Sequence, residues 1–296
     1  MGEWLIGTGC KRAATAVIGI LALAAAGCSS GTSASTAQPE LRTPVQEVQL
    51  AASTASEVNS FTATVNMDLT TKGASTGAQS VTVAGTVSEV VHPTPLAEFT
   101  FSTLKAAGSP LPGGMSEIIT SKELYVKLAA LTTMLHTDKQ WLGLPVSSMS
   151  SSSGLNFGAL FSQSDTSNPL TMTQLLAGAT DVKKAGTGTV GGVPVTEYTG
   201  SYALTTAIGK LPASVRSSVS SAFKQAGLDS STARFTVWID AQHIVRKDIT
   251  EVASSTFSES FTTTVTSVNQ PVNITAPPAS QVYTVSAASL GSIGTS

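Results

Sequence analysis

Residues 61–70 read FTATVNMDLT, and the strict alternation within this stretch decides the class of fold. Apolar side chains occupy the odd positions from Phe61 to Leu69, and Thr, Asn or Asp fills the positions between them. Successive side chains of a strand point to opposite faces, so this period of two is typical of an antiparallel strand with one buried face. Residues 81–88 repeat the pattern with three valines. The sequence therefore predicts a sheet with one apolar face.

The same alternation, interrupted by turn residues, continues along much of the chain. Beyond the first two strands it predicts strands at residues 96–103, 116–120, 123–128, 180–188, 193–203, 235–240, 244–252 and 257–268. These segments make an antiparallel sheet of about ten strands, and a sheet of this width tends to curl.

Helices are predicted where a capping residue precedes an apolar period of 3.6. Thr43-Pro44-Val45-Gln46 forms a capping box with Pro at the first helical position, so we expect a helix over about 44–58. Further helical segments are expected from Asn168 to about Ala177, from Pro212 to Gly227, and as short turns at about 129–136 and 155–162.

The fold class that follows is α+β, a curled antiparallel sheet with helices packed on its concave face. Such an arrangement encloses an apolar space between sheet and helices. Alternation does not decide whether side chains fill this space or leave it open for a ligand.

Cys28 follows a short secretory signal. Lys11-Arg12 leads into an uncharged run up to Gly27, and Ala25-Ala26-Gly27-Cys28 resembles a bacterial lipobox. The resemblance implies that Cys28 becomes the first mature residue and carries a thioether-linked lipid. A conventional signal peptide with a chance Cys is one alternative. A membrane-spanning helix is the other, although the run is shorter than the roughly 20 residues needed to span a bilayer.

These features divide the chain into four segments. Residues 1–27 are the expected lipoprotein signal peptide, and residues 28–42 a flexible tether rich in Ser and Thr. Residues 43–268 form the expected folded domain, and the Pro-containing residues 269–296 a loosely ordered C-terminal tail.

Composition excludes several classes of function. The predicted mature chain carries 14 basic and 17 acidic residues, a net charge of −3, without the clustered Lys and Arg of a nucleic-acid surface. Cys10 lies in the predicted signal peptide, so the mature domain has neither a disulfide nor a cysteine metal site. Core burial must therefore hold it together.

Catalytic motifs are weak. Ser102-Thr103-Leu104-Lys105 and Ser221-Ala222-Phe223-Lys224 both match the S-x-x-K element of acyl-transferring serine enzymes, but no K-T-G element accompanies them. The carboxylates are scattered over turns and element ends, and a glycosidase dyad would need two of them to meet in space.

Metal and aromatic sites receive no stronger support. His92, His136 and His243 fall in turns without a ligand neighbour at metal-binding spacing. Trp141 and Trp238 could line a sugar or lipid site, but ordinary packing explains them as well. We expect no enzyme activity, no cofactor and no metal.

Six segments, in this order along the chain, resemble one family. They are ELYVKL at 123–128, KQWLGL at 139–144, DVKKAG at 181–186, GGVPVTEY at 191–198, VWID at 237–240 and IVRK at 244–247. Their order resembles the actinobacterial LppX/LprAFG lipoprotein family, which is similar in fold to the LolA/LolB lipoprotein carriers. The resemblance implies a half-barrel with helices on its concave face and an apolar cavity for the acyl chains of a lipid or glycolipid.

The predicted lining of this cavity consists of apolar strand residues on the face toward the helices. They are Phe61, Val65, Met67, Val83, Phe99, Phe101, Phe235, Val237 and Ile239. A filled core is the alternative for each of them.

The expected function is that of a lipoprotein anchored through Cys28 at the outer face of the cell membrane. It would bind a lipid or glycolipid for local transfer or presentation, with a membrane transporter or envelope protein as the expected kind of partner. The alternative is a non-catalytic sensor or scaffold whose filled core leaves only its surface to recognise a partner protein.

Overall fold

The computed structural model describes residues 42–73, 77–110, 114–129, 136–146, 169–255 and 257–284. The predicted signal peptide, Cys28 and nearly all of the tether lie outside these ranges. So do the helical turn predicted at 155–162 and most of the one at 129–136.

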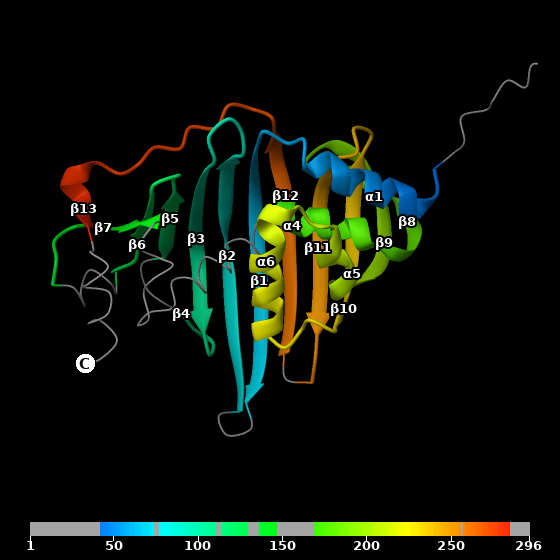
Figure 1. The fold of residues 1–296 in the computed structure, drawn as a ribbon, viewed down its shortest axis with the longest axis horizontal. Helices are drawn as coiled ribbons and strands as arrows, with labels where there is room; N and C mark the ends of the chain where they lie inside the picture. Colours follow the sequence, from blue (N-terminus) through cyan, green and yellow to red (C-terminus); the bar gives the residue numbers. More distant parts are fainter. Residues whose placement is uncertain are drawn as a thin grey trace, which may run out of the picture. The chain divides into compact units, whose positions relative to one another are not determined.

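One large curled sheet dominates the described residues (Figure 1). Its strands are β1 (Ser60–Gly73), β2 (Gly77–Val90), β3 (Leu96–Ala106), β4 (Ser109–Pro110), β5 (Met115–Ile119), β6 (Glu123–Lys127), β7 (Trp141–Pro145), β8 (Thr180–Val190), β9 (Val193–Ala203), β10 (Thr232–Asp240), β11 (Val245–Ala253), β12 (Phe257–Val268) and β13 (Val282–Thr284). The spatial order is β13-β7-β6-β5-β3-β2-β1-β12-β11-β10-β9-β8, with β4 beside β3. Among the described residues β13 and β7 pair in parallel, and all other strand pairs are antiparallel. The sheet does not close on itself, which confirms the predicted fold class.

The helices gather over one part of the sheet. They are α1 (Pro44–Ala55), α4 (Pro169–Leu175) with the 3₁₀ turn η2 (Leu176–Gly178), α5 (Leu204–Lys210) and α6 (Ala213–Gln225). In Figure 1 they lie over the half that contains β8 to β12. We call the sheet face toward the helices the inner face and the opposite one the outer face. No helix in the described ranges is long and apolar enough to cross a membrane.

The predicted start of α1 is confirmed in atomic detail. The Thr43 hydroxyl accepts from the Gln46 backbone N–H at 3.3 Å, and the Gln46 side chain accepts from the Thr43 N–H at 2.8 Å. Two backbone donors of the first turn are thus satisfied reciprocally. The helix ends at Ala55, three residues before the predicted end, because Ser56 already bonds back to Ser53 and Thr54.

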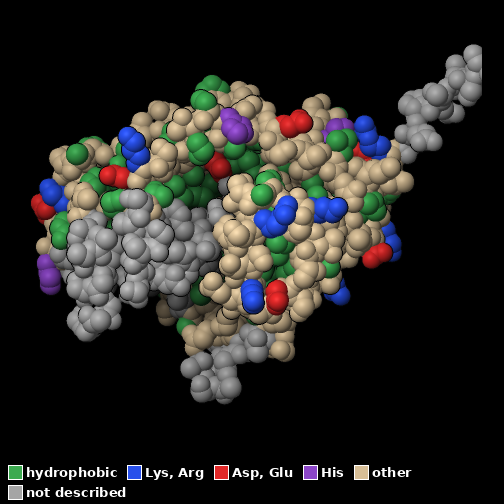
Figure 2. All heavy atoms as spheres, viewed as in Figure 1, with side chains coloured by type: hydrophobic (Ala, Val, Ile, Leu, Met, Phe, Trp, Pro, Cys, Tyr) green, Lys and Arg blue, Asp and Glu red, His purple; other side chains and the backbone are tan. Residues whose placement is uncertain are grey.

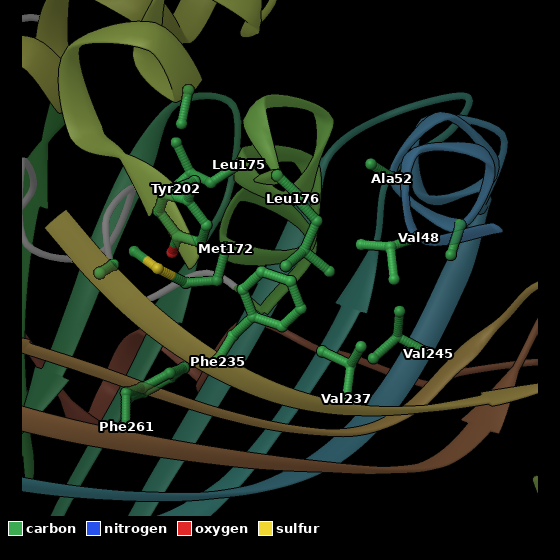
Figure 3. Packing of buried hydrophobic residues seen from close by; sticks show 14 of the residues in the cluster. Val48, Ala52, Met172, Leu175, Leu176, Tyr202, Phe235, Val237, Val245 and Phe261 are labelled. Atoms are coloured by element: carbon green, nitrogen blue, oxygen red, sulfur yellow. The ribbon is translucent and has the colours of Figure 1, made fainter. Parts of the chain in front are cut away.

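The core lies between these helices and the inner face. Figure 3 shows Leu175, Leu176 and Tyr202 directed toward Phe235 on the sheet, with Val48 of α1 packed beside them. Leu175, Leu176 and Val48 have no exposed surface. Burial of side chains of this size contributes about 1.5–3 kcal/mol each relative to exposure. This packing explains why the fold needs no disulfide.

Two predictions need correction. Within the described residues the sheet has 13 strands rather than about ten. Strands β4 and β13 have two and three residues, too few for an alternating pattern, and β7, with the sequence WLGLP, does not alternate. The segment predicted as a loose tail contains β13, whose residues Val282–Thr284 pair with β7. Gly143 of β7 allows this close approach, since a Cβ there would lie 2.7 Å from Val282 Cγ1. Residues 282–284 are therefore part of the sheet.

Candidate functional site on the inner face

The nine predicted lining residues all belong to the sheet, and most of them are core. Six lie in the buried core cluster: Phe61, Val65, Phe99, Phe235, Val237 and Ile239. Met67 and Phe101 are half-buried and pack against this cluster, and Val83 is half-buried opposite Met67. The predicted set thus divides into residues that fill a core and residues at its edge.

Half-buried apolar side chains continue past the core on β1, β2 and β3. Met67 pairs with Val83, Val83 pairs with Leu104, and Leu69 pairs with Val81, so these side chains adjoin one another on one face. Together with Phe101 they make up what we call the open strip: Met67, Leu69, Val81, Val83, Phe101 and Leu104. In Figure 2 hydrophobic side chains gather in a hollow beside the helices. The apolar face of the sheet is wider than the area over which its residues are fully buried.

Beneath α1 and α4 the core is filled. A cavity of about 20 Å³ remains there, bordered by Ala51, Phe61, Leu170 and Val245 among others. A water molecule needs roughly 10–15 Å³, so this space holds about one. Around this cavity, the described side chains of α1, α4 and the sheet leave no room for an acyl chain.

A polar group interrupts the apolar inner face next to the core. Asp248 of β11 is 2% exposed and faces inward between Val237 and Thr263. Its two carboxyl oxygens accept from the single hydroxyl of Thr250 at 3.1 and 3.2 Å. Burial raises the pKa of Asp248 to about 7, and the Thr250 hydrogen bond opposes this shift.

Two further polar side chains adjoin Asp248. Thr263 is 4% exposed, and its hydroxyl has no hydrogen-bond partner among the described residues. Tyr202 is fully buried. Burial raises the pKa of its phenol well above the ordinary value, the Asp248 carboxyl raises it further, and a hydrogen bond with Thr250 lowers it. Sequence analysis missed this group because the alternation of β11 allows either set of side chains to face inward.

Two more carboxyls occupy the inner face elsewhere. Glu259 of β12 pairs with Leu69 and Val252, and Glu117 of β5 pairs with Phe99. Burial raises the pKa of Glu259, and it raises the pKa of Glu117 to about 7. The inner face thus carries three acids in apolar surroundings.

The catalytic motifs considered from sequence are not assembled into sites. Ser102 lies within β3 and donates to the Ala84 carbonyl oxygen at 3.3 Å, whereas Ser221 lies in α6. His243 Nδ1 is 3.2 Å from a Glu47 carboxylate oxygen without hydrogen-bond geometry. Within the described ranges no three His, Cys, Asp or Glu side chains gather as metal ligands would.

The clearest ion pair has a structural role. Asp240 accepts from the backbone N–H groups of Gln242 and Ile244, both at 2.9 Å, and from Arg246 Nε at 2.6 Å. It is 4% exposed and closes the turn between β10 and β11. This agrees with the sequence-based interpretation that the scattered Asp residues serve turns.

The two tryptophans lie beside lysines. Lys247 Nζ is 4.8 Å from the centre of the Trp238 ring, and Lys127 Nζ is 5.9 Å from that of Trp141. Such contacts are worth about 0.5–1 kcal/mol at exposed sites.

The fold and the inner face together define an open, curled antiparallel sheet that holds a helical layer over part of an apolar face. No family model matches the chain by sequence, and no curated protein matches it. Among solved structures it is similar to the Mycobacterium tuberculosis lipoprotein LppX, at 18% identity and a TM-score of 0.42, over 78% of this chain and 98% of that one. It is also similar to LprF from Mycobacterium bovis, at 11% identity and a TM-score of 0.43, over 79% of this chain and 96% of that one. A putative outer membrane lipoprotein-sorting protein domain from Vibrio parahaemolyticus matches at 9% identity and a TM-score of 0.24, over 77% and 95% of the two chains.

Proposed function

We propose that this chain is a non-enzymatic, membrane-anchored lipoprotein that binds the acyl part of a lipid or glycolipid on the inner face of its sheet. It then transfers or presents the lipid close to the outer face of the membrane.

The open strip is the observation that carries this proposal. Its side chains are apolar, adjoin one another across β1, β2 and β3, and are only half-buried. Each CH₂ group that an acyl chain buries contributes about 0.8 kcal/mol, so such a surface binds acyl chains without any catalytic group. The resemblance of the order of sequence segments to the LppX/LprAFG family supports the same function.

Cys28 supplies the proposed anchor. One acyl chain gives only marginal membrane binding, and the two or more chains of a processed lipobox cysteine give durable attachment. Residues 29–42 then form a tether whose reach, from about 5–6 Å × √n, is roughly 20 Å. A domain held this close to the membrane is suited to local extraction and handover rather than to free diffusion.

A sensor or scaffold is the second candidate, and the packing beneath α1 and α4 favours it. The cavity there measures about 20 Å³, and six predicted lining residues are core. If the remaining inner face is equally closed in solution, recognition would involve the outer surface and a partner protein.

A charge placed in the open strip tests the proposal. Met67→Asp should weaken binding of monopalmitoylglycerol by at least about tenfold, because burying a carboxylate against an acyl chain is costly. The measurement is isothermal titration of the full chain carrying Cys28→Ser, which cannot be lipidated.

Asn66→Asp is the matched control. Asn66 precedes Met67 on β1 and is exposed on the outer face, so the same charge there should change the affinity less than about twofold. Circular dichroism and thermal melts show whether both variants are folded. Equal affinities for the wild type and the folded Met67→Asp variant would contradict acyl binding on the inner face.

A further inference from the structure

One row of cross-strand neighbours runs from the polar group of the inner face to the open strip. Asp248 pairs with Thr263, Thr263 with Val65, Val65 with Gly85, and Gly85 with Phe101. The row crosses β11, β12, β1, β2 and β3. Four steps of about 4.8 Å make it about 19 Å long, a length that a common long acyl chain can span. It is polar at one end and apolar over the rest.

The polar end lacks a hydrogen-bonding group. Thr263 is 4% exposed, and its hydroxyl has no partner among the described residues. Asp248 is 2% exposed, and among the described residues it accepts from one donor, the Thr250 hydroxyl, which both carboxyl oxygens share. Buried polar side chains are nearly always paired, so we expect the Thr263 hydroxyl to take a further polar partner beside Asp248.

The charge of the inner face determines which kind of polar group can bind beside Asp248 and Thr263. On strands β10 to β3, this row and the inner rows on either side of it contain one charged residue at a paired position, Asp248, and neither Lys nor Arg. Glu259 lies one inner row further, opposite Leu69. Tyr202 is the other titratable group close to Asp248. A hydroxyl or an ammonium can donate to the carboxylate, whereas an anionic head group would be buried against a like charge.

Helix α6 contributes few fully buried side chains to the core. Of the residues of α6, only Val219 and Phe223 are fully buried, and both belong to the core cluster.

We propose that this row binds a single-chain amphiphile whose polar end carries a hydrogen-bond donor, a hydroxyl or an ammonium, and that Asp248 and Thr263 hold that end. This inference rests on the proposed lipid-binding function and specifies its ligand class. The acyl chain then lies across Val65 and Gly85 toward Phe101, with the polar end inward.

Three probes of one chain length test the selectivity: monopalmitoylglycerol, hexadecylamine and palmitate. They are titrated into the full chain carrying Cys28→Ser at pH 8, where Asp248, whose pKa burial raises to about 7, is ionised. We expect the hydroxyl and amine probes to bind at least about tenfold tighter than palmitate, and the two together show which donor is preferred. Asp248→Asn should weaken hexadecylamine about 10- to 100-fold and reduce the preference over palmitate to below about threefold.

Two further variants separate binding from folding. Thr263→Val removes the unpaired hydroxyl at nearly constant shape, so it should weaken monopalmitoylglycerol about 3- to 10-fold while the melting temperature stays the same or rises. Asp68→Asn, an exposed Asp on the outer face that accepts from Thr82 at 2.8 Å, should leave all three affinities unchanged.

The outcomes distinguish the two proposals. Equal affinity for the three probes, or unchanged selectivity in Asp248→Asn and Thr263→Val, would overturn this inference, and a buried water would then be what pairs Asp248 with Thr263. The lipid-binding function would stand in that case. If none of the probes binds the wild type, the proposed function itself fails.

Discussion

Truncating Phe235 to Ala is expected to lower the free energy of unfolding by about 3–5 kcal/mol, the usual loss for a buried aromatic residue. Phe235 is 3% exposed, and its ring centre lies 6.0 Å from that of Tyr202. Its ring also covers Gly200, where an added Cβ would lie 2.6 Å from the ring edge. The surroundings are thus shaped to this ring, and little can move in to fill the space left by Ala. Urea unfolding of the full chain carrying Cys28→Ser measures the loss.

Phe101→Ala is the matched comparison. Phe101 is half-buried in the open strip, so its truncation should cost less than about half as much stability. It should, however, weaken monopalmitoylglycerol binding more than Phe235→Ala does in the variants that remain folded. Similar stability losses in the two variants would contradict the division between a filled core and an open strip.

Replacing Asp248 with Asn is expected to change how stability depends on pH. The pKa of Asp248 is about 7 in the folded protein, against an ordinary value near 3.9 in the unfolded chain. Between these values the folded state retains a proton that the unfolded state has released. The stability from this proton is fully present below about pH 4, falls as the pH rises, and is lost above about pH 7.

The size of the effect follows from the shift. About three pKa units correspond to roughly 4 kcal/mol, so the stability of Asp248→Asn relative to the wild type should rise by up to that amount between pH 4 and pH 8. Burial also raises the pKa of Glu117 and of Glu259, and this affects the pH dependence of stability equally in the wild type and in Asp248→Asn. The difference in stability between the two proteins therefore isolates Asp248. Urea unfolding at five pH values measures it.

Asp68→Asn controls for the loss of a carboxylate. Asp68 also accepts from a Thr hydroxyl but is exposed, so its replacement should shift stability by a similar small amount at every pH. Parallel pH profiles for the wild type and Asp248→Asn would show that this carboxyl is solvated in the folded protein.

The features that could be predicted from sequence are those encoded locally. The alternation at 61–70 identifies β1 and its inward set, and the capping box at Thr43 places the start of α1. Strand β12 has the predicted bounds, residues 257–268. In each case neighbours in sequence determine the outcome, through the period of side-chain directions or through backbone capping.

The features that could not be predicted depend on distant contacts. β13 has three residues and pairs in parallel with β7, which lies about 140 residues earlier in the chain. Helix α5 begins directly after β9, and its N-cap residue Ala203 makes no side-chain capping hydrogen bond. The local sequence therefore has no capping residue that would predict the start of this helix.

The polar part of the candidate site was missed for a similar reason. On β11 the set Asp248, Thr250 and Val252 faces inward, whereas Ile249 lies in the outward set. The pairing of β10 with β11 shifts between Trp238 and Ile239, so the register next to the hairpin turn does not continue unchanged to Asp248. Only the assembled sheet shows which set is buried, and therefore that an Asp lies next to the core.

Native mass spectrometry of the full chain carrying Cys28→Ser tests the central claim most directly. The protein is purified from lipid-containing cells and sprayed under non-denaturing conditions, before and after incubation with monopalmitoylglycerol. An inner face that binds acyl chains predicts an added mass equal to one amphiphile, strongly reduced in Met67→Asp and retained in Asn66→Asp. A wild-type protein that keeps its bare polypeptide mass in both states would contradict it.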